Sequence, residues 1–340
     1  MAGPHVLVVG TGSAGRRHAR NLAALGARIS GFDPRADRLD LAAREVPLLS
    51  RHTALETALG AAAYDGMVVA SPPVFHVEQA ARALELGLPV LLEKPVSPGL
   101  AEAVHLEALA AQRGVAVLLG YTWRWWPPIR ALRHRLDAGE IGELRHARFV
   151  MSAHLSDWHP GEPLDEFFMS RAALGGGALL DESHWLDLLV WMLGMPERLS
   201  ARIDRLSALE IDSDDNVDMI LDLPGGLRAT LHLDLYGRPH EKSIELVGEG
   251  GTMRWSEQPN ATSLWQAASP GWQTTPFDCE RNVMFMALAR EFLAVMAGAP
   301  AVTCSLADGV RVLQIVEAAR TSNASGRAVP LASSVRSAPC

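Results

Sequence analysis

Residues 6–15 read VLVVGTGSAG and decide the fold of the N-terminal part of this 340-residue chain. Four apolar residues predict a buried strand, and a Gly-x-Gly-x-x-Gly pattern closes it directly before a helix-like segment. Gly10 permits a tight turn, Gly12 lets the backbone approach a pyrophosphate, and Gly15 lets the helix pack on the strand. Phosphates bind at such a helix N-terminus, where free N–H groups point outward. We therefore predict a dinucleotide site whose contacts in this turn are Gly10, Gly12, Ser13, Ala14 and Gly15.

An acidic residue ends the second strand-like run, residues 27–33. Asp33 lies about 20 residues beyond the glycine pattern, where a carboxylate accepts hydrogen bonds from the adenosine ribose. This position favours NAD as the cofactor. Arg35 keeps NADP open, because a nearby arginine can bind a 2′-phosphate, although a solvated surface charge is its other interpretation. Asp33 and Arg35 are both predicted cofactor contacts.

Strand-like and helix-like segments alternate through the first third of the chain. Short apolar runs predict buried strands at residues 6–10, 27–33, 67–70, 90–93 and 115–120. Amphipathic segments predict helices at residues 15–25, 52–59, 74–86 and 100–113. This alternation predicts an α/β fold class with a doubly wound parallel sheet, a Rossmann domain over residues 1–121.

The pattern changes after residue 121. Longer β-like segments occupy residues 144–154, 217–223, 227–236, 243–247 and 252–255, and helices are expected at 181–193, 282–297 and 306–322. Pro224-Gly225-Gly226 predicts a turn between two of the strands. We predict a C-terminal α+β domain over residues 122–331 with a mostly antiparallel open sheet, followed by a loose tail at 332–340.

Composition excludes several classes of protein. The formal net charge is −8, and no basic stripe of the kind that binds nucleic acid is present. No apolar run reaches the ~18 residues of a membrane span. The three cysteines lack zinc-site spacing and give no disulfide framework, and the N-terminus lacks the pattern of a signal peptide. We expect a cytoplasmic protein without nucleic-acid or membrane partners.

Lysine is rare in this chain: of the 31 lysine and arginine residues, only Lys94 and Lys242 are lysines. An arginine stays protonated, whereas a lysine amine can lose its proton when it is desolvated or placed near another cation. Lys94 lies at the end of a predicted strand, on the edge where open α/β sheets bind ligands. It is therefore a candidate for proton transfer, and its other interpretation is a surface lysine before a proline.

The predicted strands at 67–70 and 90–93 end on the same ligand edge. Ser71 and Pro72 are predicted to contact the nicotinamide half of the cofactor there, and Glu93 joins them with Lys94. Ser71 is also a candidate N-cap for the next helix. That helix carries His76, which is a candidate cofactor contact or, alternatively, a structural histidine.

Short motifs occur along nearly the whole chain. They are the glycine pattern, Ser71-Pro72, Glu93-Lys94-Pro95, Gly120-Tyr121, Gly139-Glu140-Ile141-Gly142, the stretch GGGALLDESHWLD at 175–187, and Ser305-Leu306-Ala307-Asp308-Gly309. In this order, the motifs resemble those of the Gfo/Idh/MocA family of sugar oxidoreductases. The resemblance implies that Lys94 is the catalytic lysine and that Asp181 and His184 help to bind and ionise the substrate. His184 follows the acid by three positions instead of the commonest four. This spacing resembles a subgroup associated with carbohydrate and sugar-nucleotide metabolism, and it leaves open which of the two residues faces the substrate.

The chemistry of these residues agrees with the resemblance. Oxidation of an alcohol needs a base for the hydroxyl proton as the carbon gives up hydride. Partial desolvation and the positive nicotinamide ring of NAD⁺ favour the neutral amine of Lys94 that can accept this proton. Asp181 and His184 would share one face of the predicted helix. A satisfied structural histidine is the other interpretation of His184.

Four further side chains are candidates for the substrate side. Aromatic faces stack on sugar C–H surfaces and arginine binds carboxylate or phosphate, so Trp123 and Arg124 are predicted substrate contacts. Packing in the core is an equal alternative for the tryptophans in this stretch. Asp157 and His159 lie in a predicted substrate loop before the glycine run. No combination of these residues fits a structural zinc pattern, so we predict no metal.

We predict an NAD(P)-dependent dehydrogenase or reductase acting on a hydroxyl or keto carbon of a sugar, cyclic polyol or sugar nucleotide. One alternative, a redox-neutral epimerase or glycosidase that retains NAD, would use the same residues. The other is a non-catalytic cofactor-binding regulator, against which the presence of Lys94, Asp181 and His184 together argues. A homodimer or homotetramer is expected, because an open sheet usually needs a partner on its exposed face. Leu231, Leu233 and Leu235 form an apolar face of this sheet, and either helices of the same chain or another subunit could cover it. The substrate, the oxidised carbon and the direction of reaction stay open.

Overall fold

The structure, a computed structural model, describes residues 3–158 and 168–331. The chain forms two compact units, residues 1–126 with 279–310 and residues 127–278 with 311–340. The expected tail at 332–340 and the predicted substrate residue His159 lie outside the described residues. No helix in the described part is both long enough and apolar enough to cross a membrane.

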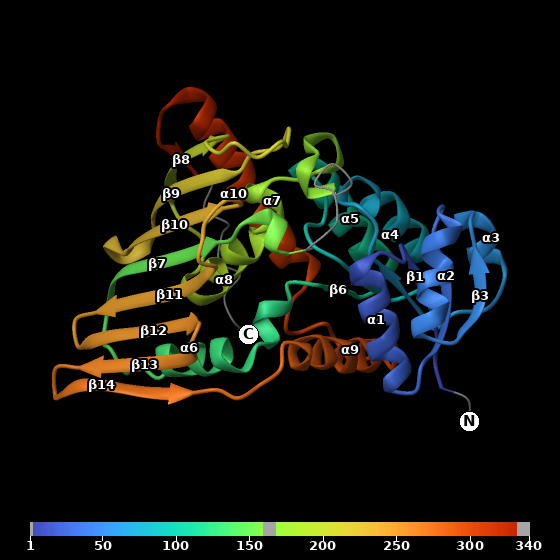
Figure 1. Ribbon diagram of the computed structural model, residues 1–340, viewed down its shortest axis with the longest axis horizontal. Coiled ribbons are helices and arrows are strands. Elements are labelled where there is room, and N and C mark those ends of the chain that lie inside the picture. The colour runs from blue at the N-terminus through green and yellow to red at the C-terminus, as the bar shows by residue number, and fades with distance from the viewer. Residues whose placement is uncertain (1–2, 159–167, 332–340) are drawn as a thin grey trace. The chain divides into compact units, whose positions relative to one another are not determined.

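A parallel sheet of six strands in the order β3-β2-β1-β4-β5-β6 forms the centre of the first unit (Figure 1). The central strands β1, β4 and β5 are buried along their whole length, as strands covered by helices on both faces must be. The strand order confirms the predicted doubly wound fold, in which ligands bind beyond the carboxyl ends of the strands. The strands are β1 (His5–Val9), β2 (Arg28–Phe32), β3 (Leu48–His52), β4 (Gly66–Val69), β5 (Val90–Leu92) and β6 (Val117–Leu119).

The helices of the first unit follow the strands. They are α1 (Ser13–Ala24), α2 (Ala36–Glu45), α3 (Leu55–Gly60), α4 (His76–Glu85), α5 (Leu100–Arg113) and α9 (Asn282–Met296), with the 3₁₀ turns η1 (Pro73–Phe75) and η2 (Thr122–Trp125). Sequence patterns missed α2 and β3. β3 is the edge strand and buries none of its residues fully, so it lacks the apolar run that marked the other strands.

The position of α9 differs from the predicted domain division. Residues 279–310 were expected in the second domain, but they belong to the first compact unit. Asn282 at the start of α9 exchanges two side-chain hydrogen bonds with Asn21 of α1, at 3.1 and 3.0 Å. Phe292 and Met296 fill the space beside Gly66, where a side chain would collide with them. The buried apolar side of α9 thus completes the core of the first unit, and sequence order alone does not reveal this return.

The second unit contains a nine-stranded sheet in the order β14-β13-β12-β11-β7-β10-β9-β8-β15 (Figure 1). β7 and β10 are parallel and the other neighbours are antiparallel, which confirms the predicted mostly antiparallel sheet. The strands are β7 (Leu144–Ser152), β8 (Arg198–Asp204), β9 (Asn216–Asp222), β10 (Arg228–Asp234), β11 (Glu241–Gly248), β12 (Gly251–Glu257), β13 (Asn260–Gln266), β14 (Ser269–Pro276) and β15 (Val329–Pro330). Sequence patterns missed β8 and the last three strands; β14 is exposed throughout and carries no apolar alternation.

Helices of the same unit cover the apolar face of this sheet. Leu231, Leu233 and Leu235 are buried, and α6, α7 and α8 contact the strands from that side. Thr230 and His232 alternate with these leucines and are half-buried, so the opposite face is polar. The helices and short turns of the unit are α6 (Pro127–Asp137), α7 (Ala178–Asp181), α8 (Ser183–Leu193), η3 (Leu155–Asp157), η5 (Phe168–Ser170), η6 (Ala172–Leu174) and η7 (Pro224–Gly226). A further helix, α10 (Leu306–Ser325), begins in the first unit and belongs to the second from residue 311.

Candidate active site

The glycine turn after β1 has the geometry of a phosphate cradle. Gly10 has a φ of +82°, and a Cβ atom there would lie 2.7 Å from the backbone nitrogen of Ser71. A Cβ atom at Gly15 would collide with the carbonyl oxygen of Gly10. Gly12 precedes α1 without a side-chain cap, so the first N–H groups of the helix are available to an anion. The residues of this turn therefore fit a dinucleotide pyrophosphate.

Asp33 is buried at the end of β2 and is held in place from two directions. Its carboxylate accepts hydrogen bonds from the Thr11 N–H at 2.8 Å and the Arg35 N–H at 3.0 Å. These bonds tie the acid to the glycine turn, next to the place where an adenosine ribose would bind. The Arg35 guanidinium forms an exposed ion pair with Asp37 at 2.6 Å, an arrangement that agrees with a surface charge.

Ser71 and His76 connect the ends of neighbouring strands. The Ser71 hydroxyl donates to Gln79 of α4 at 2.6 Å, whereas Pro72 takes the N-cap position of η1. His76 is buried, with Nδ1 2.7 Å from the Pro95 carbonyl oxygen and Nε2 2.8 Å from the Ser71 carbonyl oxygen. Burial lowers the pKa of His76, and the two carbonyls oppose that effect. Both ring nitrogens of His76 are thus engaged within the protein.

The Glu93-Lys94-Pro95 segment follows β5 directly, and the Lys94–Pro95 bond is cis. Glu93 Oε1 lies 2.7 Å from Nε2 of the buried His18, and Glu93 Oε2 accepts the Lys94 N–H at 3.2 Å. Burial raises the pKa of Glu93, but the hydrogen bond and charge of His18, with the charges of Lys94 and Arg17, outweigh burial and lower it to about 2. Glu93 is therefore a fixed anion, and the backbone of Lys94 is bound to it.

The glycine run of the second unit packs against an acidic segment that sequence analysis did not select. Gly177 has a φ of +120°, and a side chain there would collide with the Asp214 carboxylate. Asp214 accepts the Leu179 N–H at 2.8 Å, and its neighbour Asp212 accepts the Ala172 N–H at 2.6 Å. Burial raises the pKa of Asp214. The run Asp212-Ser213-Asp214-Asp215 directly before β9 was the available signal for this support.

Asp181 and His184 do not lie on one continuous helix, contrary to the expectation of a single helix at 181–193. α7 ends at Asp181 and α8 begins at Ser183, with Glu182 between them at φ −93° and ψ 15°. Asp181 is buried and its Oδ2 accepts the Gly177 N–H at 3.0 Å. His184 lies in the first turn of α8 and is half-buried. The argument from a shared helix face therefore does not hold, because α7 is only one turn long and breaks before His184.

The predicted substrate contacts lie in two kinds of surroundings: Trp123 and Arg124 are buried, and Asp157 is exposed. Trp123 and Arg124 are buried in η2, and the Arg124 guanidinium contacts the Thr303 carbonyl at 2.8 Å and Asp308 at 3.4 Å. Asp157 forms an exposed, two-bonded ion pair with Arg238. These contacts agree with packing for Trp123 and Arg124 and with a surface ion pair for Asp157.

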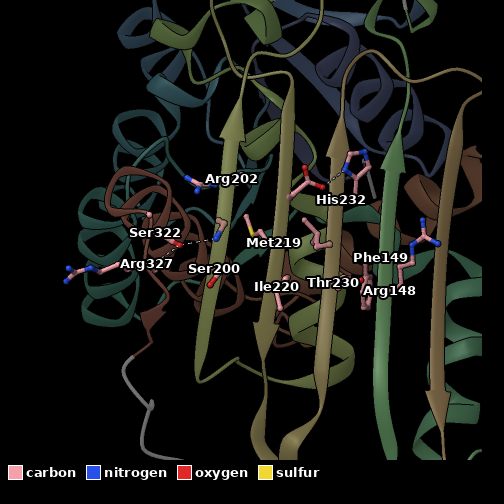
Figure 2. A pocket seen from close by; sticks show the side chains of 14 residues that line it. Arg148, Phe149, Ser200, Arg202, Met219, Ile220, Thr230, His232, Ser322 and Arg327 are labelled. Atoms are coloured by element: carbon pink, nitrogen blue, oxygen red, sulfur yellow. Dashed lines mark hydrogen bonds and ion pairs between the residues drawn. The ribbon is translucent and has the colours of Figure 1, made fainter.

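The predicted residues are divided between the two units. The cofactor contacts, Lys94, Trp123 and Arg124 belong to the first unit, whereas Asp157, Asp181 and His184 belong to the second. A hollow of about 540 Å³ on the sheet of the second unit is lined by residues such as Arg148, Arg202 and His232 (Figure 2). It contains none of the predicted site residues. Among the described residues, no group of three or more histidine, cysteine, aspartate or glutamate side chains is arranged to hold a metal ion.

Comparison with known protein families decides the classification. Residues 5–121 match the model of the oxidoreductase family with an NAD-binding Rossmann fold, and residues 129–254 match the model of the GFO/IDH/MocA C-terminal domain. The chain belongs to the Gfo/Idh/MocA family of oxidoreductases. Both parts of the family architecture are present in order, and the NAD-binding domain coincides with the unit that carries the glycine turn. The predicted family, fold and NAD cofactor are therefore confirmed.

Individual relatives of this Gfo/Idh/MocA protein differ in how much of the chain they cover. Inositol 2-dehydrogenase 3 of Saccharopolyspora erythraea is 28% identical over 96% of this chain and 94% of its own length. An uncharacterized oxidoreductase of Synechocystis is 30% identical over 60% of this chain, and the match spans about half, 54%, of that relative. The fold matches that of levoglucosan dehydrogenase in complex with NADH, with a TM-score of 0.88 at 18% identity, over 97% of this chain and 99% of that one.

Proposed function

We propose that this oxidoreductase moves a hydride between NAD and a hydroxyl or keto carbon of a sugar, cyclic polyol or sugar nucleotide, with Lys94 as the proton-transfer residue. One observation carries the proposal. Gly10, Ser71 and Lys94 follow the neighbouring strands β1, β4 and β5, so they come together at one edge of the parallel sheet. In this type of sheet, that edge is where a dinucleotide binds. The relatives named inositol 2-dehydrogenase and levoglucosan dehydrogenase support a carbohydrate or polyol substrate.

Each group has a distinct task in the proposed reaction. The nicotinamide ring, when NAD is bound, supplies the hydride acceptor or donor. The Lys94 amine accepts the hydroxyl proton as the carbon is oxidised and returns it during reduction. Glu93 holds the Lys94 backbone, the glycine turn binds the pyrophosphate of the dinucleotide, and Asp33 binds its adenosine ribose. Asp181 and His184 bind and orient the substrate hydroxyls, and the other proposed substrate contacts are Trp123, Arg124, Asp157 and His159.

A substrate screen tests this function. Purified protein is incubated with sugars, cyclic polyols and sugar nucleotides in the presence of NAD⁺ or NADP⁺, and NADH or NADPH formation is followed by absorbance. We expect NADH to form in stoichiometric amounts with at least one of these substrates, and a lower kcat/KM with NADP⁺. Turnover without net NADH would instead support a redox-neutral reaction. Tight NAD binding with no turnover of any compound would contradict the proposal.

We also propose that the protein is a homodimer or homotetramer. Helices of the same chain cover the apolar face that carries Leu231, Leu233 and Leu235, so the proposal does not rest on that face. It rests on the opposite face of the sheet, which carries Thr230 and His232 and is only half-buried within one chain. Sedimentation velocity across a concentration series tests the proposal. A mass that stays at 36.6 kDa throughout would contradict it.

A further inference from the structure

Two buried histidines hold the residues on either side of Lys94. His18 and His76 are each only 1% exposed, although histidine is a polar residue that is seldom buried completely. Nε2 of His18 lies 2.7 Å from Oε1 of Glu93, the residue before Lys94. Nδ1 of His76 lies 2.7 Å from the carbonyl oxygen of Pro95, the residue after it. The Lys94 backbone is therefore anchored on both sides by imidazole rings.

His18 links Lys94 to the helix that begins at the dinucleotide turn. It lies on α1, one turn after Gly15, and among the described residues its ring bonds only to Glu93, because Nδ1 has no hydrogen-bond partner there. The other carboxylate oxygen of Glu93 accepts the Lys94 N–H. A Cβ atom at Gly120 would lie only 3.3 Å from this carboxyl group, so the glycine leaves room for it. Both oxygens of one half-buried carboxylate are thus used to fix Lys94 relative to α1.

His76 links Lys94 to the end of the neighbouring strand β4. Its second nitrogen lies 2.8 Å from the Ser71 carbonyl oxygen, so one ring joins the segment after β4 to the segment after β5. A neutral imidazole donates a hydrogen bond to one of the two carbonyl groups, and a protonated one donates to both. In either form the ring lies between the segment after β4 and the segment after β5 and packs against both. The two histidines therefore hold Lys94 from α1 and from β4 independently.

We propose that His18 and His76 are positioning residues that fix the Lys94 backbone at the dinucleotide edge, a role that rests on the proposed function of Lys94. Proton transfer requires that the amine and the substrate hydroxyl meet within hydrogen-bond distance. A lysine side chain is long and flexible, so its reach is defined only if its backbone is fixed. A displacement of about 1 Å can lower the rate by about 10²-fold.

Lysine-specific NMR tests the proposal without a substrate. Protein labelled with ¹⁵N-lysine gives two lysine backbone signals, because Lys94 and Lys242 are the only lysines, and Lys94→Arg assigns them. His18→Leu and His76→Leu should each shift the Lys94 signal and leave the Lys242 signal in place. His18→Gln keeps a side-chain donor for Glu93 and should restore most of the wild-type position. If His18→Leu does not fold, His18→Asn, whose shorter side chain does not reach Glu93, removes the same contact and leaves the Lys94 N–H bond to Glu93 in place.

His5→Leu is the matched control. His5 is also a buried histidine of the first unit, but it starts β1 and contacts Ser30, at 2.9 Å. This variant should lower the thermal midpoint without moving the Lys94 signal. An unchanged Lys94 signal in His18→Leu and His76→Leu, or an equal shift in His5→Leu, would overturn the proposal.

Kinetics adds a second readout once a substrate is known. His18→Leu should lower kcat about 10- to 100-fold with a much smaller change in the KM for NAD, and His18→Gln should recover most of the loss. A lower kcat in His5→Leu of the same size would overturn the positioning role. If the wild-type enzyme turns over no sugar or polyol, the proposed function fails, whereas the NMR comparison still decides whether the histidines fix Lys94.

Discussion

The segments around Lys94 and Asp181 are both held by polar contacts that are buried or partly buried, but the groups that hold them differ. At Lys94, imidazole side chains hold a carboxylate and a carbonyl beyond the end of a regular strand. At Asp181, carboxylates hold backbone N–H groups of a glycine run and a single helical turn. The first segment rests on the sheet itself, so losing one contact moves it locally. The second has little regular structure of its own, so losing one contact removes most of its support.

The largest effect is expected where a side chain is added to the less regular segment. Gly177→Ala places a Cβ atom against the Asp214 carboxylate at a φ of +120°, and strain and overpacking together predict a loss of about 3 kcal/mol in the free energy of unfolding. Urea denaturation measures this loss. Gly60→Ala, which adds its Cβ to open space within α3, is the control and should change stability little. A change below about 0.5 kcal/mol in Gly177→Ala would show that the carboxylate contact does not support α7.

The sheet of the second unit carries another histidine–carboxylate contact. Its loss should lower stability without moving Lys94, so it distinguishes the effect of a charge pair from the effect of a positioning contact. The His232 ring lies 3.0 Å from the Asp234 carboxylate and 2.8 Å from the Asp218 carboxylate. The hydrogen bonds of Asp234 and Asp218 outweigh burial and raise the pKa of His232 from 6.5 to about 9. Figure 2 shows His232 where it lines the hollow on this sheet. The raised pKa means that the charged ring stabilises the fold fully below pH 6.5, and that this contribution disappears as the pH rises through 9. With allowance for solvent screening, we expect His232→Gln to cost about 1 kcal/mol in the acidic range.

Denaturation of wild type and His232→Gln across this pH range measures the difference. The difference in the free energy of unfolding should shrink toward zero above pH 9. The Lys94 NMR signal should be the same in wild type and His232→Gln at each pH. A difference in stability that is constant with pH would contradict the assigned charge. A shifted Lys94 signal would contradict the local nature of the anchoring contacts.

The smallest effect is expected at Arg35, which lies beside the cofactor edge but pairs with an exposed acid. Because its ion pair with Asp37 is exposed, Arg35→Ala should change stability by less than about 0.5 kcal/mol. It should leave kcat/KM with NAD nearly unchanged. A selective loss of activity with NADP, measured beside NAD in the same assay, would show that Arg35 binds a 2′-phosphate instead.

Sequence patterns predicted those parts of the fold that depend on regular periodicity. The glycine turn, the central strands and the position of Lys94 just after a strand were predictable because buried parallel strands are continuous apolar runs. The return of α9 to the first unit was not, because an apolar helix does not specify which sheet it covers. His18, Asp212 and Asp214 were missed because their role depends on contacts with residues far away in the sequence.

The break between α7 and α8 was missed for a related reason. Residues 181–193 have a helical pattern throughout, but hydrogen bonds from the Gly177 N–H to Asp181 and from the Leu179 N–H to Asp214 fix a separate first turn. Local propensity is a weak guide where long-range contacts of this kind decide the backbone. The prediction that Asp181 and His184 contact the substrate therefore rests on the resemblance and not on helix geometry.

The central claim is that Lys94 transfers the proton that accompanies hydride transfer, and the kcat of Lys94→Met tests it most directly. With a substrate from the screen and saturating NAD⁺, we predict a loss in kcat of about 10²- to 10⁴-fold, the range contributed by general acid–base catalysis. NADH affinity, measured by fluorescence, should change far less. Lys94→Arg should also be impaired, since arginine stays protonated. A Lys94→Met enzyme that turns over at close to the wild-type rate would contradict the account.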